Sequence, residues 1–182
     1  VRSITMTSAV DKLGKIYDVQ TFVTPVGFKF LGPVMMREDA LVAGEESGGY
    51  AFRGNIPERD GILSGLMILE MMVNTNKRIS ELVEMLTDLV GAHHYHRLDL
   101  TFKDSERKTI YDRLSVAKPK KLANRRVDSI ETCDGFRFVL DGGYWSLVRF
   151  SGTEPLLRVY AEAESKFELE NLIADTRAIT GL

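Results

Sequence analysis

The sequence predicts an α/β protein in two parts, an α/β layer over residues 1–92 and a small α+β domain over residues 96–182. In the first part, helical and strand-like stretches alternate along the chain. In the second part, a strand and a helix precede a run of strands and a closing helix. The length of 182 residues and the apolar content of 44% leave ample material for packed cores, which argues against intrinsic disorder.

Charge balance and cysteine content narrow the classes of partner. The chain has 24 Lys+Arg and 26 Asp+Glu, so its net charge of −2 predicts neither nucleic acid nor a membrane surface as a partner. No apolar run approaches the roughly 18 residues that a membrane span needs. Because the single cysteine, Cys133, cannot form an internal disulfide, a cytoplasmic location is expected. The chain starts with Val1 and no secretory leader follows, so we expect a cut N-terminus.

The first part begins with a helix, followed by two short strands. Ser8 is a candidate N-cap. The apolar residues after it recur at helical spacing: Val10, Leu13, Ile16 and Tyr17. The β-rich stretches 19–23 and 40–43 predict strands. Between them, the segment 25–33 is bounded by turn formers and predicts one short helix or an ordered loop.

Two further helices complete the first part. The nearly continuous apolar stretch 62–73 starts after Asp60-Gly61 and predicts a buried helix. Its methionine-rich centre, 67–72, is too short to span a membrane and is expected in the core. The last helix has Ser80 as its N-cap and Gly91 as its C-terminal stop.

The second part has the pattern of an antiparallel sheet with two helices. Alternation over 96–102 predicts its first strand, and Asp104 is a candidate cap for a helix that ends near Val116. Four strand-like runs follow: 126–132, 136–140, 145–150 and 156–163. Asp141-Gly-Gly143 is a strong hairpin signal, and Ser165-Lys-Phe-Glu168 matches a capping box that opens the final helix.

The loop Gly44-Glu-Glu-Ser-Gly-Gly49 follows directly on a strand-like stretch. In open α/β sheets, ligands tend to bind at the C-terminal edge of the strands. Glu45 can accept a pair of hydrogen bonds from neighbouring hydroxyls, as in a sugar ring, and Ser47 can both donate and accept. The alternative is an acidic surface turn, because six residues alone form a weakly specific pattern.

A second loop, Arg149-Phe-Ser-Gly-Thr-Glu-Pro155, lies between two predicted strands, and Arg158 follows three residues later. It offers a guanidinium group, two hydroxyls and backbone N–H groups around Gly152, which suit a tetrahedral dianion such as phosphate. Pro155 stiffens the exit of the loop. The alternative is a capped turn with two solvated arginines.

Four motifs stand in order along the chain: Thr24-Pro-Val-Gly-Phe-Lys29, Gly44-Glu-Glu-Ser-Gly48, Glu58-Arg-Asp-Gly61 and Arg149-x-Ser-Gly-Thr-Glu-Pro155. In this order they resemble the α-D-phosphohexomutases, the phosphoglucomutase/phosphomannomutase family. The resemblance covers essentially all of the sequence. Four motifs in sequence are far more specific than any one of them.

This resemblance implies a fold and an activity. Members are four-domain enzymes that move a phosphoryl group between the 1- and 6-positions of a hexose through a bisphosphorylated sugar, using an active-site phosphoserine and Mg²⁺. By resemblance, residues 1–92 are a truncated α/β/α mixed-sheet domain, the family's third, and residues 96–182 are its fourth. The missing N-terminal domains would be partners within the same chain, and Mg²⁺ and glucose 1,6-bisphosphate belong to the full-length enzyme.

The resemblance also implies a set of substrate-binding residues. Lys29 lies near the substrate, while Glu45 and Ser47 bind the sugar hydroxyls. The phosphate that does not react is held by the second loop and the following strand: Arg149, Ser151, Gly152, Thr153 and Arg158. Both groups are expected to converge on one cleft, with a hinge near Ala92–Tyr95 that closes over the substrate.

The catalytic motifs of the family are absent from the sequence. It contains no Ser-His-Asn-Pro-like serine loop and no Asp-Gly-Asp-x-Asp-Arg-like cluster for magnesium. We therefore expect the substrate-recognition half of a mutase, inactive alone, with no catalytic residue and no bound metal. Glucose is expected over mannose, and an amino sugar is less favoured, although Gly49 leaves the sugar open. The alternatives are a stand-alone sugar-phosphate-binding module and a structural domain with vestigial loops.

Three further features each have a chemical and a structural interpretation. His93-His-Tyr-His96 resembles part of a zinc site, but without a second ligand cluster a solvated hinge is favoured. The basic run 118–126 lacks interleaved aromatic residues, so a solvated linker is favoured over a nucleic-acid contact. Cys133 is expected to be a buried or half-buried small residue without chemistry.

Overall fold

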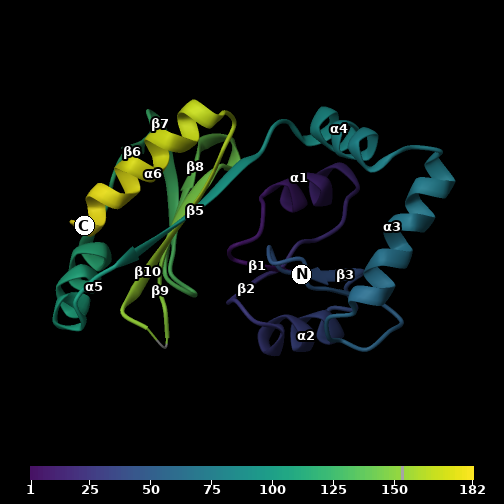
Figure 1. Cartoon of the computed structure of the whole chain (residues 1–182), viewed down its shortest axis with the longest axis horizontal. Helices are drawn as coiled ribbons and strands as arrows, with labels where there is room; N and C mark the ends of the chain where they lie inside the picture. Colours follow the sequence, from purple (N-terminus) through teal and green to yellow (C-terminus); the bar gives the residue numbers. More distant parts are fainter. Residues whose placement is uncertain (153) are drawn as a thin grey trace. The chain divides into compact units, whose positions relative to one another are not determined.

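The computed structural model describes residues 1–152 and 154–182. The chain divides into two compact units, Val1–Gly91 and Ala92–Leu182 (Figure 1). Each unit has its own sheet and its own helices. Among the described residues, we find no helix with the length and apolar character that crossing a membrane requires.

The sheet of the first unit is mixed and has four strands. These are short: β1 (Arg2–Ser3), β2 (Val23–Thr24), β3 (Val42–Gly44) and β4 (Tyr50–Phe52). In the order β2-β1-β3-β4, β1 is parallel to β2 and to β3, whereas β4 is antiparallel to β3. The mixed sheet confirms the α/β prediction. The strands β1 and β4 have no counterpart in the predicted elements, because two or three residues form too short a pattern.

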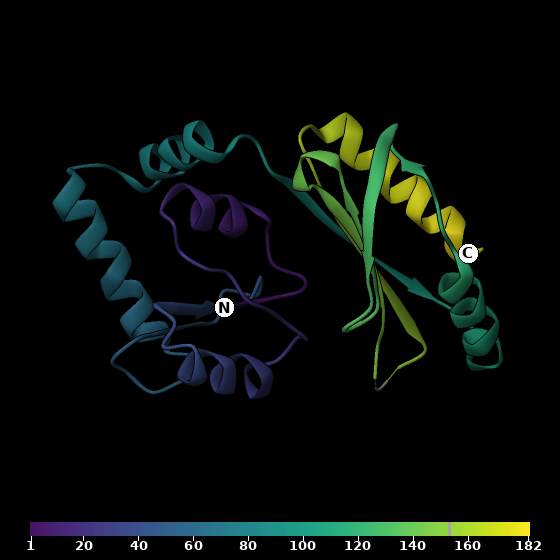
Figure 2. The same ribbon diagram turned by 180° about the vertical axis from the view of Figure 1, so that it is seen from behind.

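Four helices accompany this sheet: α1 (Ala9–Ile16), α2 (Phe28–Arg37), α3 (Gly61–Thr75) and α4 (Ile79–Val90). The first two lie on opposite sides of the sheet (Figure 1 and Figure 2). The strand order explains this placement, since right-handed crossovers that step in opposite directions put their helices on opposite faces. A small core lies between α2 and the sheet and contains Phe28, Leu31, Met35, Ala43 and Ala51.

The ends of α1 and α2 differ from the predictions. Ser8 occupies the N-cap position of α1 but makes no side-chain cap hydrogen bond. Instead, the Oγ1 atom of Thr7 accepts a hydrogen bond from the N–H of Ala9 at 3.1 Å. The helix predicted within 25–33 continues through Pro33 to Arg37, because the residues beyond the proline still pack on the core.

The helix α4 begins earlier than predicted. Its N-cap is Arg78 rather than Ser80, because the Glu81 carboxylate accepts a hydrogen bond from the N–H of Arg78 at 2.8 Å. The carboxylate thereby satisfies the N–H of the N-cap residue itself, as the glutamate of a capping box does. At the other end, Gly91 stops the helix as predicted, with φ of +86°.

The stretch 62–73 forms a helix, as predicted, but this helix is not buried as it was expected to be. None of the residues of α3 is buried, and Ile62 and Val73 are 82% and 78% exposed. Asp60 caps the helix by accepting a hydrogen bond from the N–H of Leu63 at 2.8 Å. The small sheet offers α3 contacts along β4, and most of its apolar surface has no cover within the described part of the chain.

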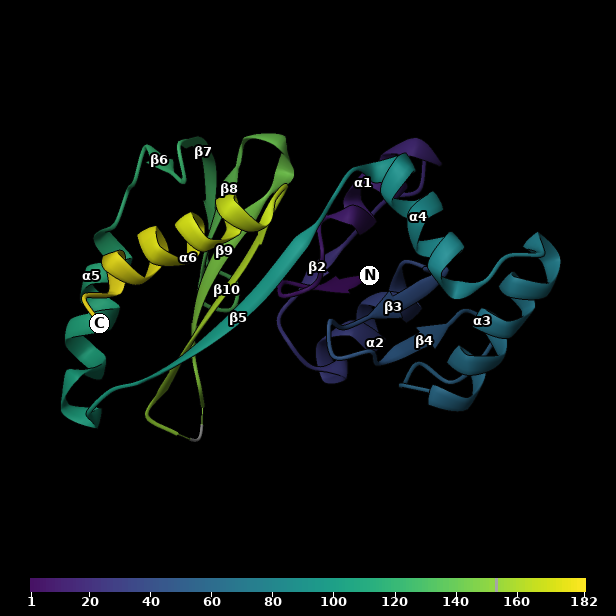
Figure 3. The same cartoon turned by 45° about the horizontal axis from the view of Figure 1, so that its top comes forward.

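The second unit contains a six-stranded antiparallel sheet in the order β5-β10-β9-β8-β7-β6. The strands are β5 (His94–Thr101), β6 (Lys121–Leu122), β7 (Arg125–Glu131), β8 (Phe136–Leu140), β9 (Trp145–Phe150) and β10 (Leu156–Ala163). A 3-10 turn, η1 (Asp104–Glu106), leads into α5 (Arg107–Val116), and α6 (Lys166–Thr180) closes the chain. Figure 3 shows α6 lying along one face of the sheet, where Leu169 and Leu172 join the core. This architecture confirms the predicted antiparallel sheet with two helices.

The turn signals of the second unit act as predicted. A 3-10 turn, η2 (Asp141–Gly143), joins β8 to β9, and Gly142 and Gly143 have φ of +83° and +82°. Positive φ costs glycine little, which explains why the hairpin needs these residues. Ser165 caps α6 by accepting a hydrogen bond from the N–H of Glu168 at 3.2 Å.

The basic run 118–126 is largely exposed to solvent, as expected, but it is not only a linker. Its second part forms β6 and the start of β7, which pair with each other. The Arg125 guanidinium binds the carboxylates of Glu164 and Glu168. These carboxylates lie about forty residues further along the chain, so the local charge pattern could not reveal the pairing.

Candidate functional site

The loop between β3 and β4 is fixed by backbone hydrogen bonds. The N–H of Glu45 donates to Gly49 O, and the N–H of Gly48 donates to Glu45 O, both at 3.0 Å. Gly48 has φ of +87°, a conformation that favours glycine. Glu45 is only 4% exposed, and its Oε1 accepts a hydrogen bond from the N–H of Gly27 at 2.8 Å. The loop is therefore attached to the N-terminus of α2.

This attachment brings together the three residues predicted to bind the sugar. Lys29 is on the first turn of α2, two residues after the glycine that Glu45 binds, and it is exposed. Its Nζ atom lies 4.9 Å from the centre of the Phe30 ring. Ser47 is exposed on the loop itself. An ammonium group, a hydroxyl and a fixed carboxylate thus lie on two connected segments, and all three can hydrogen-bond to a polyol.

Arg59 lies beside this loop. In the sequence it was visible only as a member of the motif Glu58-Arg-Asp-Gly61. Its guanidinium lies 5.5 Å from the centre of the Phe28 ring and 2.9 Å from the Glu58 carboxylate. A Cβ atom at Gly49 would lie 2.6 Å from Cδ of Arg59. The arginine side chain therefore fills the space that a larger residue at position 49 would need.

In the loop between β9 and β10, Gly152, Glu154 and Pro155 are exposed to solvent. The loop is closed by a hydrogen bond of 2.8 Å from the N–H of Ser151 to Leu156 O. Ser151 is 4% exposed, whereas Gly152 is exposed and a Cβ atom there would meet nothing within 4 Å. Neither crowding nor a positive φ requires a glycine at position 152, so the space beside this residue is open to the approach of a ligand. The predicted residue Thr153 lies outside the described residues.

Two arginines face each other across β9 and β10. Arg149 and Arg158 are direct register partners, so their side chains share one face, and like charges in this position repel. Arg158 is also opposite Asp99 on β5. The Nε atom of Arg149 lies 2.9 Å from Asp134 Oδ2. Burial disfavours the charged form of Arg149, but the Asp134 carboxylate outweighs this effect and raises the pKa of Arg149.

The Nε atom of Arg158 is buried and has no hydrogen-bond partner among the described residues. Leaving such a donor unpaired is costly, which points to an acceptor from outside the described chain. A phosphate between the two guanidinium groups would relieve both their repulsion and the missing hydrogen bond. The face beside Ser151 and Gly152 is therefore suited to a doubly charged oxyanion.

No group of three or more His, Cys, Asp or Glu side chains that could hold a metal ion occurs in residues 1–152 and 154–182. The Mg²⁺ that the resemblance implies has no ligand set among these residues. Part of the histidine run lies in a strand rather than in a solvated segment: His94 and His96 belong to β5, and the His93 side chain is only 10% exposed.

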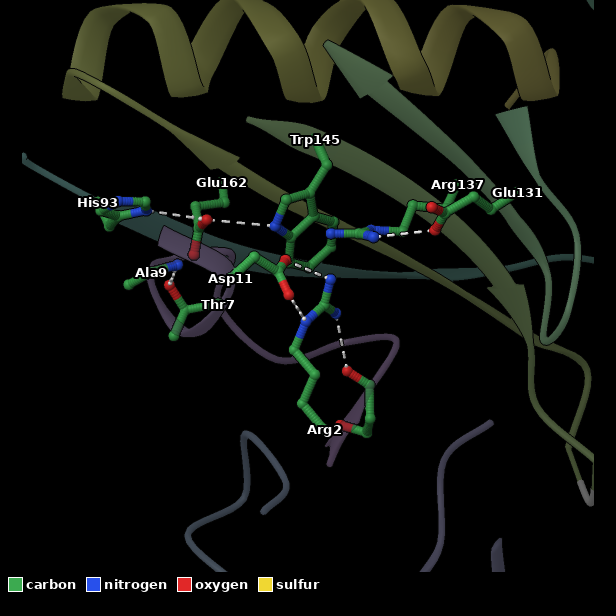
Figure 4. A network of polar contacts seen from close by, with 10 residues as sticks. Arg2, Thr7, Ala9, Asp11, His93, Glu131, Arg137, Trp145 and Glu162 are labelled. Atoms are coloured by element: carbon green, nitrogen blue, oxygen red, sulfur yellow. Dashed lines mark hydrogen bonds and ion pairs between the residues drawn. The ribbon is translucent and has the colours of Figure 1, made fainter. Parts of the chain in front are cut away.

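A buried polar network explains the position of His93. Figure 4 shows Glu162 between His93 and Trp145. The Nε1 atom of Trp145 donates to Glu162 Oε1 at 3.2 Å, and the Nδ1 atom of His93 lies 2.9 Å from the same oxygen. The Arg137 guanidinium lies 4.8 Å from a Trp145 ring centre and donates to Glu131 at 2.9 Å. His93 and Trp145 stabilise the carboxylate of Glu162, which is almost completely buried. Because the three residues lie far apart in the sequence, a local pattern cannot reveal their contact.

Cys133 is exposed, so the prediction that it is buried or half-buried is wrong. It lies in the turn between β7 and β8, whose few residues cannot cover the side chain. Although the residue is exposed, neighbouring atoms remove part of the water around its sulfur, and this desolvation, together with the carboxylates of Glu131 and Asp134, raises the pKa of the thiol.

Comparison with known proteins gives two matches to family models. Residues 1–89 match the phosphoglucomutase/phosphomannomutase alpha/beta/alpha domain III. Residues 105–179 match the phosphoglucomutase/phosphomannomutase C-terminal domain. The matches correspond to the first and the second unit.

Curated relatives are similar over nearly the whole chain. A phosphoglucomutase/phosphomannomutase of Thermococcus kodakarensis is 31% identical over 166 residues, 91% of this chain and 34% of the relative. A phosphoglucosamine mutase of Methanocaldococcus jannaschii is 31% identical over 173 residues, 95% of this chain and 37% of the relative. The chain thus spans about a third of the length of these relatives.

Solved structures agree. A putative phosphomannomutase from Thermus thermophilus has a TM-score of 0.78 and 30% identity, and the match covers 100% of this chain and 36% of that one. The open form of a Paramecium phosphoglucomutase, parafusin, shares the fold with a TM-score of 0.81 at 24% identity, covering 99% of this chain and 37% of that one. Family models match both units, and the relatives match nearly all of this chain. The chain therefore belongs to the phosphoglucomutase/phosphomannomutase family.

Proposed function

We propose that this chain is the substrate-recognition half of a phosphohexomutase, which interconverts a hexose 1-phosphate and a hexose 6-phosphate through a bisphosphorylated sugar. The first unit recognises sugar hydroxyls through Lys29, Glu45 and Ser47. The second unit holds the phosphate that does not react, through Arg149, Ser151, Gly152, Thr153 and Arg158. One observation carries the proposal: two arginines face each other beside an open glycine turn, and one has a buried donor without a partner among the described residues.

The charges of the second unit favour a phosphate dianion over a neutral ligand. A guanidinium group offers two parallel N–H donors to two oxygens of one phosphate, which an ammonium group cannot do. Because Asp134 neutralises part of the charge of Arg149, the pair remains stable when empty. A phosphate then supplies the acceptor that Arg158 Nε lacks and adds the hydroxyl of Ser151 and the N–H of Gly152 as donors.

In the first unit, a fixed carboxylate favours recognition of hydroxyl groups. The hydrogen bond from Gly27 holds Glu45 in one orientation, so little side-chain entropy is lost when a ligand binds. Hydroxyls on neighbouring ring carbons can donate to one carboxylate, while the exposed Ser47 and Lys29 add a donor or acceptor and a cation.

Recognition at a distance from the reacting atoms is useful in phosphoryl transfer. Binding energy from the non-reacting phosphate and the sugar can align the transferring phosphoryl group with its acceptor. The phosphoserine and the Mg²⁺ belong, in this proposal, to parts of the longer protein beyond these residues. A cytoplasmic location is proposed with it, because the single cysteine gives no internal disulfide.

Glucose remains the proposed sugar. The side chain of Arg59 fills the space beside Gly49 that a larger residue at position 49 would occupy. The first unit therefore presents a guanidinium group at this place. Some relatives are named for glucosamine phosphate, which makes it the essential competitor in the test. We expect the affinity for glucose 6-phosphate to exceed that for mannose 6-phosphate and glucosamine 6-phosphate.

The phosphate part of the proposal is tested by titrating the chain with glucose 6-phosphate and inorganic phosphate while recording amide NMR spectra. Both ligands should shift the amides of Ser151 and Gly152. Arg149→Ala should weaken binding by tenfold or more, because a charge-assisted bidentate contact is lost. The control is Arg126→Ala, which removes an exposed arginine that pairs with Asp128. If Arg149→Ala binds as tightly as wild type, the proposal fails.

The sugar part is tested with Glu45→Gln. This variant keeps an acceptor for the N–H of Gly27 while removing the charge. It should lower the affinity for glucose 6-phosphate several-fold and leave that for inorganic phosphate unchanged. A stand-alone sugar-phosphate-binding module would instead bind glucose 6-phosphate with micromolar affinity in the 182-residue chain. Equal losses for both ligands would contradict the division of roles between the units.

A further inference from the structure

Arg107, the first residue of α5, contacts the backbone of the loop between β9 and β10. Its Nη2 atom lies 3.3 Å from Ser151 O and 3.2 Å from Glu154 O. One guanidinium nitrogen thus donates to two carbonyl groups on either side of the loop's tip. Neither the motifs of the sequence nor the residues expected to bind phosphate include this arginine.

Aromatic rings hold the Arg107 guanidinium in place. Its central carbon lies 5.4 Å from the centre of the Phe102 ring and 5.3 Å from that of Phe150. These two rings are themselves packed edge to face, 5.8 Å apart. Phe102 also donates its N–H to Pro155 O at 3.2 Å, so the same support contacts the far end of the loop. The guanidinium is therefore a fixed part of the loop's base.

The contact with Ser151 O determines where the next N–H points. In a trans peptide, the C=O of one residue and the N–H of the following residue point in opposite directions. When Arg107 draws the carbonyl of Ser151 toward itself, the N–H of Gly152 is directed to the opposite side. Arg107 also neutralises the partial negative charge of two carbonyl oxygens, which would otherwise repel an approaching oxyanion.

We propose that Arg107 is a positioning residue for the phosphate loop, which orients the N–H of Gly152 toward the ligand without contacting the ligand itself. This inference rests on the proposed function, because it needs a phosphate at the loop. A lysine cannot replace the arginine: an ammonium group lacks the planar surface that packs between two rings. The role therefore depends on the shape of the guanidinium as well as on its charge.

The experiment compares wild type with Arg107→Ala, Arg107→Lys and the control Arg126→Ala by titration with inorganic phosphate and amide NMR. In Arg107→Ala, phosphate affinity should fall about tenfold, and the phosphate-induced shift of the Gly152 amide should shrink. The Nε signal of Arg149 should still respond to phosphate. Arg107→Lys should recover less than half of the lost affinity. Thermal unfolding and the amide spectrum of the sheet identify any variant that fails to fold, and for such a variant Arg107→Met keeps the packing while removing the donors.

The titrations distinguish a failure of the proposed function from a failure of the role of Arg107. If wild type shows no phosphate-dependent shift, the proposed function fails, and this inference fails with it. If wild type binds and Arg107→Ala binds equally with an unchanged Gly152 shift, only the role of Arg107 is overturned. Full recovery in Arg107→Lys would also overturn it, since charge at a distance would then suffice.

Discussion

Gly152, in the loop between β9 and β10, is a position where a substitution can change ligand binding without changing the stability of the fold. Several glycines elsewhere have structural reasons: Gly48 and Gly142 have positive φ, and a Cβ at Gly32 would lie 2.6 Å from Pro57 O. Gly152 has neither reason. A substitution there should therefore affect the ligand and leave the protein intact, which is the usual behaviour of a binding position.

We expect Gly152→Ala to leave the thermal unfolding midpoint within about 1 °C of wild type and to weaken phosphate binding about fivefold or more, because the methyl group obstructs the approach to the backbone. Calorimetry and NMR titration measure the two effects. Gly48→Ala is the matched control, since its φ of +87° predicts a destabilisation of about 1 kcal/mol. Tight phosphate binding by Gly152→Ala would show that the ligand does not approach this backbone.

The thiol of Cys133 gives a pH-dependent prediction. Partial burial, Glu131 and Asp134 all disfavour its thiolate and raise its pKa, so at pH 8 less thiolate is present than in a free cysteine. Alkylation by iodoacetamide should be slower than that of glutathione at pH 8 and should accelerate as the pH rises through the raised pKa. Asp134→Asn should increase the rate a few-fold, because one neighbouring negative charge is removed. Asp128→Asn serves as the control, and equal rates in both variants would contradict this electrostatic cause.

Among the elements, α3 departs furthest from expectation. Its sequence has the apolar character of a core helix, yet no residue of it is buried in the described structure. A helix that is apolar all round is normally covered. The capping by Asp60 shows that local signals define where the helix begins, while burial depends on what packs beside it.

Replacing apolar residues of α3 should therefore improve the behaviour of the isolated chain. Ile62→Lys together with Val73→Lys should lower the fluorescence of a bound hydrophobic dye about twofold without lowering the unfolding midpoint, because both side chains are largely exposed. Leu31→Lys is the contrasting control: this side chain is fully buried in α2, and its replacement should unfold the first unit. A large loss of stability in the double variant would mean that α3 is covered in solution.

At the scale of the whole molecule, we propose that the chain binds substrate and does not catalyse the mutase reaction by itself. It spans about a third of the length of its curated relatives. Its sequence contains no serine loop of the family type, and the described residues hold no metal-binding cluster. Binding without turnover is the behaviour that this composition predicts.

We expect no conversion of glucose 1-phosphate by the 182-residue chain in the presence of Mg²⁺ and glucose 1,6-bisphosphate. Phosphorus NMR, followed over hours, detects the 6-phosphate directly. Arg149→Ala is the control for contamination, because a host enzyme would give the same rate with either sample. Turnover by wild type that disappears in Arg149→Ala would show that the chain is catalytic by itself.

Much of the fold followed from local patterns. The limits of β8, β9 and β10, the hairpin at 141–143 and the cap at Ser165 were predictable, because turn residues and alternation act over a few neighbouring positions. The very short strands β1 and β4 were not, since two or three residues carry no periodicity. The candidate loops were likewise visible as motifs, while Arg107, which supports one of them, carries no signal of its own.

The type and order of most elements, the two loops and the family resemblance could be predicted from the amino-acid sequence, because these depend on neighbouring residues and on the order of motifs. Which residues pair became visible in the folded chain. The tertiary structure placed Arg149 opposite Arg158, enclosed Glu162 between His93 and Trp145, and left α3 exposed. The physical reason is that strand register, buried hydrogen bonds and solvent exposure arise between segments far apart in the chain, where local patterns carry no information.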